Sequence, residues 1–166
     1  TDYSPTERET LLTIDTPWKV DFQKGMRGPD ETYVMTELQT WDKNEDERIR
    51  YFSGTATYTN TFKLKKQPDQ PVWIDLGRVM VMARVYVNNQ YAGGVWTSPY
   101  RLNIQHLLHK GTNTLRVEVV NNWQNRLIGD QKLPENERPT WTSVNPWRAD
   151  SPLQESGLVG PVRLLQ

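Results

Sequence analysis

The sequence predicts an all-β protein, an antiparallel β-sandwich, on three observations. Between Val72 and Asn122, short segments with a two-residue apolar period alternate with turn residues about every eight to twelve positions. The run 51–65, YFSGTATYTNTFKLK, places a row of threonines opposite apolar residues, as a pleated sheet requires. The length of 166 residues fits one domain, which we place at 11–166 after a polar linker at 1–10.

The N-terminal half supplies the first predicted strands. Residues 11–14 and WKVDF at 18–22 alternate, and in the second segment Trp18, Val20 and Phe22 share one face. A loop at 25–30 precedes a further short strand in YVMTEL. The charge run 41–50 could hold a calcium ion or an acid/base pair, but it has no Gly-containing ligand loop. We interpret it as a solvated surface stretch.

The central segment predicts a hairpin. Residues 79–87 alternate, with Val81, Ala83, Val85 and Val87 on one face and Met80, Met82, Arg84 and Tyr86 on the other. The pair at 88–89, Asn-Asn, tolerates positive φ and reverses the chain into a strand that begins near residue 91. Two consecutive glycines at 93–94 indicate a bulge or a close approach of another backbone or a ligand.

The C-terminal half completes the predicted sheet. One short helical turn is expected near residues 107–111, and TLRVEVV at 114–120 alternates again as a strand. Residues 124–156 are rich in Pro, Trp and polar residues and lack a sustained period, which predicts a long loop. The final GLVGPVRLLQ closes the sheet.

Composition excludes several classes of protein. Lys plus Arg and Asp plus Glu are 20 each, which disfavours a nucleic-acid partner. No apolar run is long enough to cross a bilayer, and no charged-then-apolar leader begins the chain. The absence of cysteine fits a cytosolic protein and many bacterial envelope proteins alike. Seven Trp and seven Tyr imply either a large aromatic core or flat faces on which a ligand stacks.

A search for catalytic chemistry gives no candidate. His106 and His109 lack the neighbouring carboxylates of a metal site, and we expect both on the surface. Acids in the long loop, Asp130, Glu135, Glu137 and Asp150, could in principle form a glycosidase pair. Such a pair needs a rigid scaffold with a fixed separation, which a Pro-rich loop does not supply. We therefore expect no catalytic residues and no cofactor in this chain, and nothing indicates a structural calcium.

Several motifs together carry a resemblance to a known family. They are VYVN at 85–88, the Gly93 and Trp96 pair, the turn 111–115 with its Gly-x-Asn-x-Leu pattern, and NRLIGD at 125–130. From about Trp18 onward the chain resembles the sugar-binding jelly-roll domain of glycoside hydrolase family 2. More narrowly, it is similar to the β-sandwich at the C-terminal end of large bacterial α-L-rhamnosidases of family 106.

The resemblance implies a galactose-binding-like jelly roll whose hydrolytic carboxylates belong to another domain. Carbohydrate and the catalytic domain of a parent glycoside hydrolase are then the expected partners. We expect that parent to be a periplasmic or secreted bacterial protein.

Aromatic and polar residues near two loops are the predicted sugar ligands, because indole rings stack on pyranoses while amide and charged groups bond their hydroxyls. They are Trp96, Tyr100, Arg101, Trp123, Asn125, Arg126 and Asp130. For Trp96 the alternative is a core position, and for Arg126 with Asp130 it is a structural ion pair. Trp141 and Trp147 either fold back as anchors or dock on a neighbouring domain, and we prefer docking.

Two functions follow from these patterns. The chain is either a carbohydrate-binding accessory module or a structural domain that packs on the parent catalytic domain and binds no sugar alone. The sequence disfavours a third possibility, that the chain is itself a hydrolase.

Overall fold

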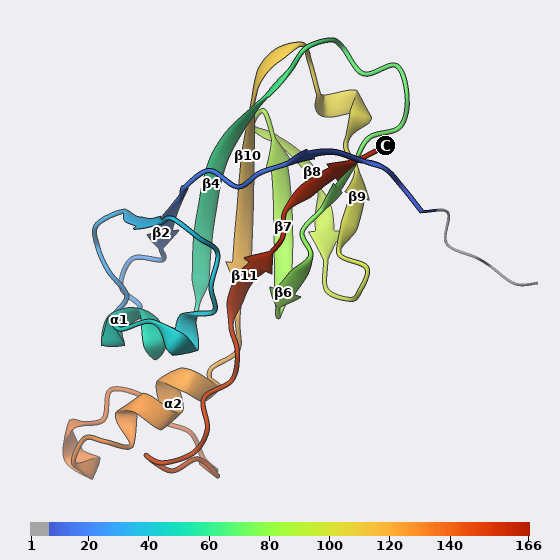
Figure 1. The fold of residues 1–166 in the computed structure, drawn as a ribbon. Helices are drawn as coiled ribbons and strands as arrows, with labels where there is room; N and C mark the ends of the chain where they lie inside the picture. The colour runs from blue at the N-terminus through green and yellow to red at the C-terminus, as the bar shows by residue number, and fades with distance from the viewer. Residues whose placement is uncertain (1–6) are drawn as a thin grey trace, which may run out of the picture.

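The computed structural model describes residues 7–166 and consists mainly of antiparallel strands (Figure 1). The strands are β1 (Thr10–Thr13), β2 (Trp18–Phe22), β3 (Tyr33–Met35), β4 (Thr55–Leu64), β5 (Trp73–Asp75), β6 (Arg78–Met80), β7 (Met82–Val87), β8 (Gln90–Val95), β9 (Arg101–Asn103), β10 (Gly111–Val120), β11 (Gly157–Gly160) and β12 (Arg163–Leu165). The helical segments are η1 (Trp41–Lys43), α1 (Glu47–Arg50), η2 (Gln105–Leu107), α2 (Gln124–Asp130) and η3 (Glu135–Glu137). The described residues contain no helix long and apolar enough to cross a membrane.

Two main sheets form the predicted sandwich. A six-stranded sheet has the order β3-β2-β4-β10-β7-β8, and a four-stranded sheet has the order β1-β12-β5-β9. A short two-stranded sheet joins β11 to β6. The long pair β4 and β10 runs through the centre of the larger sheet with unbroken register from Gly111–Leu64 to Val120–Thr55. The all-β, antiparallel prediction is thus confirmed.

The core lies on the inward faces that the alternation predicts. In β2 the predicted Trp18, Val20 and Phe22 are buried, and in β4 the apolar row is buried opposite the threonines. Tyr58 of β4 is fully buried, and its hydroxyl accepts a hydrogen bond from Trp41 Nε1 at 2.6 Å. Burial raises the pKa of Tyr58 to about 12, although the hydrogen bonds oppose that shift.

The predicted β7–β8 hairpin is also present. Asn88 and Asn89 both have positive φ, 50° and 63°, as a two-residue hairpin turn of this hand requires. The ladder shifts register between Val85 and Tyr86, so the strand carrying the two glycines is bulged. A Cβ on Gly93 would lie 3.1 Å from the Leu102 side chain, so the bulge is confirmed and the close neighbour of Gly93 is a side chain rather than another backbone.

The predicted strand 79–87 is divided in the structure. Residues before position 81 pair with β11 as β6, whereas those after it join the larger sheet as β7. Val79 is fully buried, but Val81 lies at the break and is 40% exposed. The prediction that Val81 shares a face with Ala83, Val85 and Val87 is therefore wrong, because the chain changes sheets there and the two-residue period does not continue across the break.

The charge run 41–50 is not simply a solvated stretch. Its charged side chains lie at the surface or partly covered, but η1 and α1 bury Trp41 and Ile49 completely. Asp46 caps α1 by accepting a hydrogen bond from the Arg48 amide at 2.9 Å. Two buried apolar residues within ten positions gave too weak a period to outweigh the charges.

The predicted loop 124–156 begins with a helix, so that prediction is wrong for its first quarter. α2 and the following segment lie beyond one end of the sheets, at the same end as α1 (Figure 1). The predicted short helical turn near residue 107 is present as η2. Of the predicted linker 1–10, residues 1–6 lie outside the described residues, and Glu9 exchanges backbone hydrogen bonds with Gln166.

Candidate functional site

Helix α2 organises the surface that carries most of the predicted ligand residues. Just before the helix, Asn122 Oδ1 accepts a hydrogen bond from the Gln124 amide at 3.1 Å. Ile128 is buried and anchors the helix. Successive residues 123, 126, 127 and 130 share one helical face, since they are spaced three or four apart.

An open cleft of about 440 Å³ lies between α2 and the segment that follows it. Five residues line this aromatic cleft: Trp123, Leu127, Thr140, Trp141 and Thr142. The indole of Trp141 is 87% exposed and that of Trp123 is 53% exposed. The cleft therefore offers two accessible aromatic faces beside two hydroxyl-bearing side chains.

A charged cluster borders the cleft. Asp130 accepts two parallel hydrogen bonds from the Arg27 guanidinium, both at 2.9 Å, and one from the Thr140 hydroxyl at 2.5 Å. Arg126 Nε lies 3.6 Å from Asp130 Oδ1. Thr140 thus belongs both to the cleft and to the cluster of Arg27, Arg126 and Asp130.

The pKa values of this cluster reflect its burial and its two cations. Burial, the largest single effect, opposes ionisation of Asp130. The hydrogen bonds from Arg27 and Thr140 and the charges of Arg27 and Arg126 outweigh it and lower the pKa of Asp130. For Arg126, burial and then the charge of Arg27 lower the pKa.

Asn125 fastens α2 to the returning chain. Its Nδ2 donates to the Gln154 carbonyl at 2.7 Å, and its Oδ1 accepts from the Gln154 amide at 2.8 Å. The Arg126 amide donates to the Ser53 hydroxyl at 3.2 Å. Asn125 and Asp130 are both buried, and other residues of the chain hydrogen-bond their side chains. Their assignment as sugar ligands stays a prediction.

The other predicted ligand residues lie on a different part of the chain. Trp96 follows β8 and is 67% exposed, so the core alternative for it is wrong. Tyr100 packs partly buried against the core. Arg101 begins β9, and its Nε donates to Asp75 at 3.0 Å, while Arg163 contacts the same carboxylate at 3.2 Å. These three residues do not line the aromatic cleft.

The two predicted interface residues differ in exposure. Trp141 does not fold back, because it is the most exposed of the large apolar residues in the part of the chain that the structure describes. Trp147 is half-buried, and its amide donates to Asn145 Oδ1 at 3.0 Å. Val144 between them is 77% exposed.

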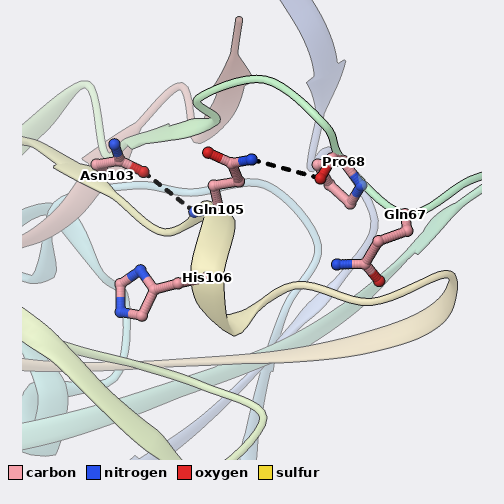
Figure 2. A pocket seen from close by; sticks show the side chains of 5 residues that line it. All are labelled: Gln67, Pro68, Asn103, Gln105 and His106. Atoms are coloured by element: carbon pink, nitrogen blue, oxygen red, sulfur yellow. Dashed lines mark hydrogen bonds between the residues drawn. The ribbon is translucent and has the colours of Figure 1, made fainter.

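A second hollow of about 580 Å³ lies beside η2 and is polar (Figure 2). It is lined by Gln67, Pro68, Asn103, Gln105 and His106. Figure 2 shows Gln105 between the two sides of this hollow. Its backbone amide donates to Asn103 Oδ1 at 3.1 Å, and its side-chain Nε2 donates to the Pro68 carbonyl at 3.4 Å. No Trp, Tyr or Phe side chain lines this hollow, and His106 is exposed as predicted.

The side chains around the two hollows give little support to catalysis or to metal binding. Glu135 and Glu137 are exposed on η3, and Asp130 is engaged by Arg27 and Thr140. Within residues 7–166 no group of three or more His, Asp or Glu side chains is placed to hold a metal ion.

Sequence reasoning missed Arg27 and Thr140. Arg27 comes from a loop that was recognised by composition alone, 103 residues before its partner Asp130. Its positive φ of 60° could not be predicted from the residue type, because glycine or asparagine is the usual residue in that conformation. No local pattern could connect either residue to α2.

The fold is an antiparallel β-sandwich domain with open clefts on its surface. Comparison with known proteins identifies its family. Residues 32–153 match the family model described as "Glycosyl hydrolase 2 galactose-binding domain-like". The chain therefore belongs to this family.

Three known proteins show the similarity in more detail. The chain is 36% identical to a protein of Formosa agariphila named "Putative beta-glucuronidase", over 77% of this chain and 13% of that protein. It superimposes on the solved rhamnosidase from Novosphingobium sp. PP1Y with a TM-score of 0.88 and 41% identity, covering 99% of this chain and 16% of that one. A β-glucuronidase from Ruminococcus gnavus, at 19% identity and a TM-score of 0.58, shares the fold over 71% of this chain and 23% of that one.

These coverages bear on the role of the chain. It spans less than a quarter of each of the three proteins, so most of each relative lies outside the similarity. The predicted family, a glycoside hydrolase family 2 sugar-binding-type domain with a rhamnosidase among its relatives, is confirmed.

Proposed function

We propose that this chain is a non-catalytic accessory domain of a larger bacterial glycoside hydrolase and that it binds a glycan in the aromatic cleft. Its relatives support the first part, because proteins named as a rhamnosidase and a β-glucuronidase contain a matching segment as a small fraction of their length. Reactivity then belongs to another domain of the parent enzyme.

The observation that carries glycan binding is the pairing of exposed indoles with hydroxyl groups in one cleft. Trp123 and Trp141 present ring faces on which the apolar side of a pyranose stacks. The Thr140 and Thr142 hydroxyls donate to Asp130 and to the Val144 carbonyl, and their oxygens can accept hydrogen bonds from the sugar hydroxyls. The hollow beside η2 has no Trp, Tyr or Phe side chain in its lining, so the aromatic cleft fits a sugar better.

Calorimetric titration of the isolated chain with oligosaccharides that contain rhamnose, galactose or a uronic acid tests this proposal. Trp141→Ala should lower the affinity about tenfold or more, because one stacking face is lost. Its free energy of unfolding should change by no more than about 0.5 kcal/mol, since the side chain is exposed.

Trp96→Ala is the matched control, because Trp96 is also exposed but lies outside the cleft. It should bind as the wild type does. Loss of binding in this variant alone would move the site to the β8–β9 segment, where Trp96, Tyr100 and Arg101 were predicted to act. Absence of binding to every oligosaccharide would refute the proposal.

Docking on the parent catalytic domain is the second candidate function, and the exposure of Trp141 and Val144 favours it. Their exposed fractions of 87% and 77% are those of an uncovered apolar surface, and such residues concentrate in interface cores. In the full-length parent, Trp141→Ala with Val144→Ser should then lower the melting temperature of the catalytic domain. The same pair of changes should leave the melting temperature of the isolated chain unaltered.

A further inference from the structure

The charged cluster beside the aromatic cleft has one more cation than anion. Arg27 and Arg126 face a single carboxylate, that of Asp130. The Arg126 side chain is only 10% exposed, and that of Asp130 only 3%. An excess positive charge is therefore held in a largely buried place, where an uncompensated ion is costly.

Arg126 does not find a hydrogen-bond partner for its buried Nε. That atom is fully buried, and no acceptor among residues 7–166 bonds to it. The nearest carboxylate oxygen, Asp130 Oδ1, lies at 3.6 Å, beyond the usual hydrogen-bonding range. The same carboxylate also accepts hydrogen bonds from Arg27 at both oxygens and from Thr140 at Oδ2, so one negative charge is shared by two guanidinium groups.

The cluster adjoins the cleft through Thr140. Thr140 lines the cleft and donates to Asp130, so a single hydrogen bond separates the cleft wall from the ion pair. On α2, Trp123 and Leu127 of the cleft share a helical face with Arg126 and Asp130 of the cluster. A sugar ring stacked in the cleft therefore lies next to the excess positive charge.

We propose that the glycan bound in the aromatic cleft is anionic, carrying a carboxylate or a sulfate ester that pairs with Arg126 and Arg27. This inference rests on the proposed glycan binding and specifies its substrate class. Guanidinium groups suit both oxyanions, since their planar donors form paired, charge-assisted hydrogen bonds. The stacked ring supplies the contact area, and the oxyanion supplies the charge that the chain itself lacks.

Three oligosaccharides of similar length test the inference by calorimetry: a neutral galactan, an oligogalacturonide and a sulfated galactan. We expect at least one of the two charged ligands to bind about tenfold or more tightly than the neutral one. This preference should fall as salt is added, because ion pairing is screened. A preference for the carboxylate or for the sulfate ester identifies the oxyanion, and either supports the inference.

Two variants locate the preference at the cluster. Arg126→Gln should lower the affinity for the charged ligand about tenfold more than it lowers the affinity for the neutral galactan. Arg27→Gln, at a more exposed position, provides the same test should Arg126→Gln fold poorly by circular dichroism. Arg148→Gln is the control, because Arg148 is an exposed arginine of the segment after α2 and makes no ion pair with Asp130.

The outcomes separate this inference from the function on which it rests. Equal binding of neutral and charged ligands overturns the anionic class and leaves glycan binding intact. An equal effect of Arg126→Gln and Arg148→Gln also overturns it, since the preference would then reflect general charge. No binding of any ligand overturns both. Where no ligand binds, Arg126→Gln is tested in the full-length enzyme. If it weakens the attachment of this domain there, the anion that balances Arg126 is an acidic side chain of the neighbouring domain.

Discussion

Asp130 illustrates how single residues set the shape of the cleft. One carboxylate joins the end of α2 to Arg27 of an early loop and to Thr140 of the following segment. The spacing of four between Arg126 and Asp130 made an ion pair predictable, and the two side chains do lie near one another. The Arg27 contact was not predictable, because pairing across 103 positions depends on the tertiary fold.

Asp130→Asn should destabilise the protein by about 2 kcal/mol at neutral pH, since it removes a charged partner from Arg27. The exposure of Arg27 keeps the effect below that of a fully buried pair. The folded-state pKa of Asp130 lies below its ordinary value of 3.8. The ion pair therefore contributes stability above pH 3.8 and loses it as the pH falls through the folded-state pKa.

Urea unfolding at neutral and at acid pH checks this sign. Wild type and Asp130→Asn should differ at pH 7 and converge in acid, where the native carboxyl is protonated. Asp150→Asn, at an exposed acid of the following segment, is the control and should match the wild type at both pH values. A difference that persists unchanged in acid would show that the aspartate acts through its shape.

At the scale of elements, local alternation was enough for strands and too weak for short helices. β2, β4, β7 and β10 follow the two-residue period, because one face of each is buried against the core. α2 has seven residues, with Ile128 as its one buried apolar side chain, so it shows no amphipathic stripe. It is held instead by Asn125, whose hydrogen bonds reach Gln154.

Asn125→Ala should therefore loosen the segment between α2 and β11. Two part-buried hydrogen bonds to Gln154 are lost, at a cost of about 2 kcal/mol. Limited trypsin digestion should cleave after Lys132 or Arg148 about tenfold faster than in the wild type, because cleavage follows local opening.

Asn136→Ala is the control for this digestion, since Asn136 is exposed in the same segment. Its cleavage rate should match that of the wild type. Equal rates for Asn125→Ala and the wild type would show that the segment is held by contacts other than this pair of hydrogen bonds.

At the scale of the whole molecule, the sandwich follows from the sequence, whereas its surfaces follow from the packing. Inward faces are repeated along many strands, so errors such as Val81 leave the architecture unchanged. The aromatic cleft joins Trp123 to Trp141 across eighteen positions without a period. The sequence motif drew attention to 123–130, but only the structure shows that Thr140 and Trp141 complete the cleft.

The isolated chain should release no nitrophenol from aryl rhamnosides, galactosides or glucuronides. Asp130 is ion-paired, and Glu135 and Glu137 are exposed on a short turn, so these acids do not form a rigid glycosidase pair. The full-length parent enzyme serves as the positive control. Turnover by the isolated chain that Glu135→Gln or Glu137→Gln abolishes would contradict this prediction.

The uneven burial of the tryptophans gives the protein a built-in optical reporter. Trp18 and Trp41 are sealed in the core, whereas Trp96, Trp123 and Trp141 are open to solvent. Acrylamide should therefore quench a red-shifted part of the emission and spare a blue-shifted part. A ligand seated between Trp123 and Trp141 would shield the first part alone, so occupancy of the cleft and loss of the fold can be told apart in one spectrum.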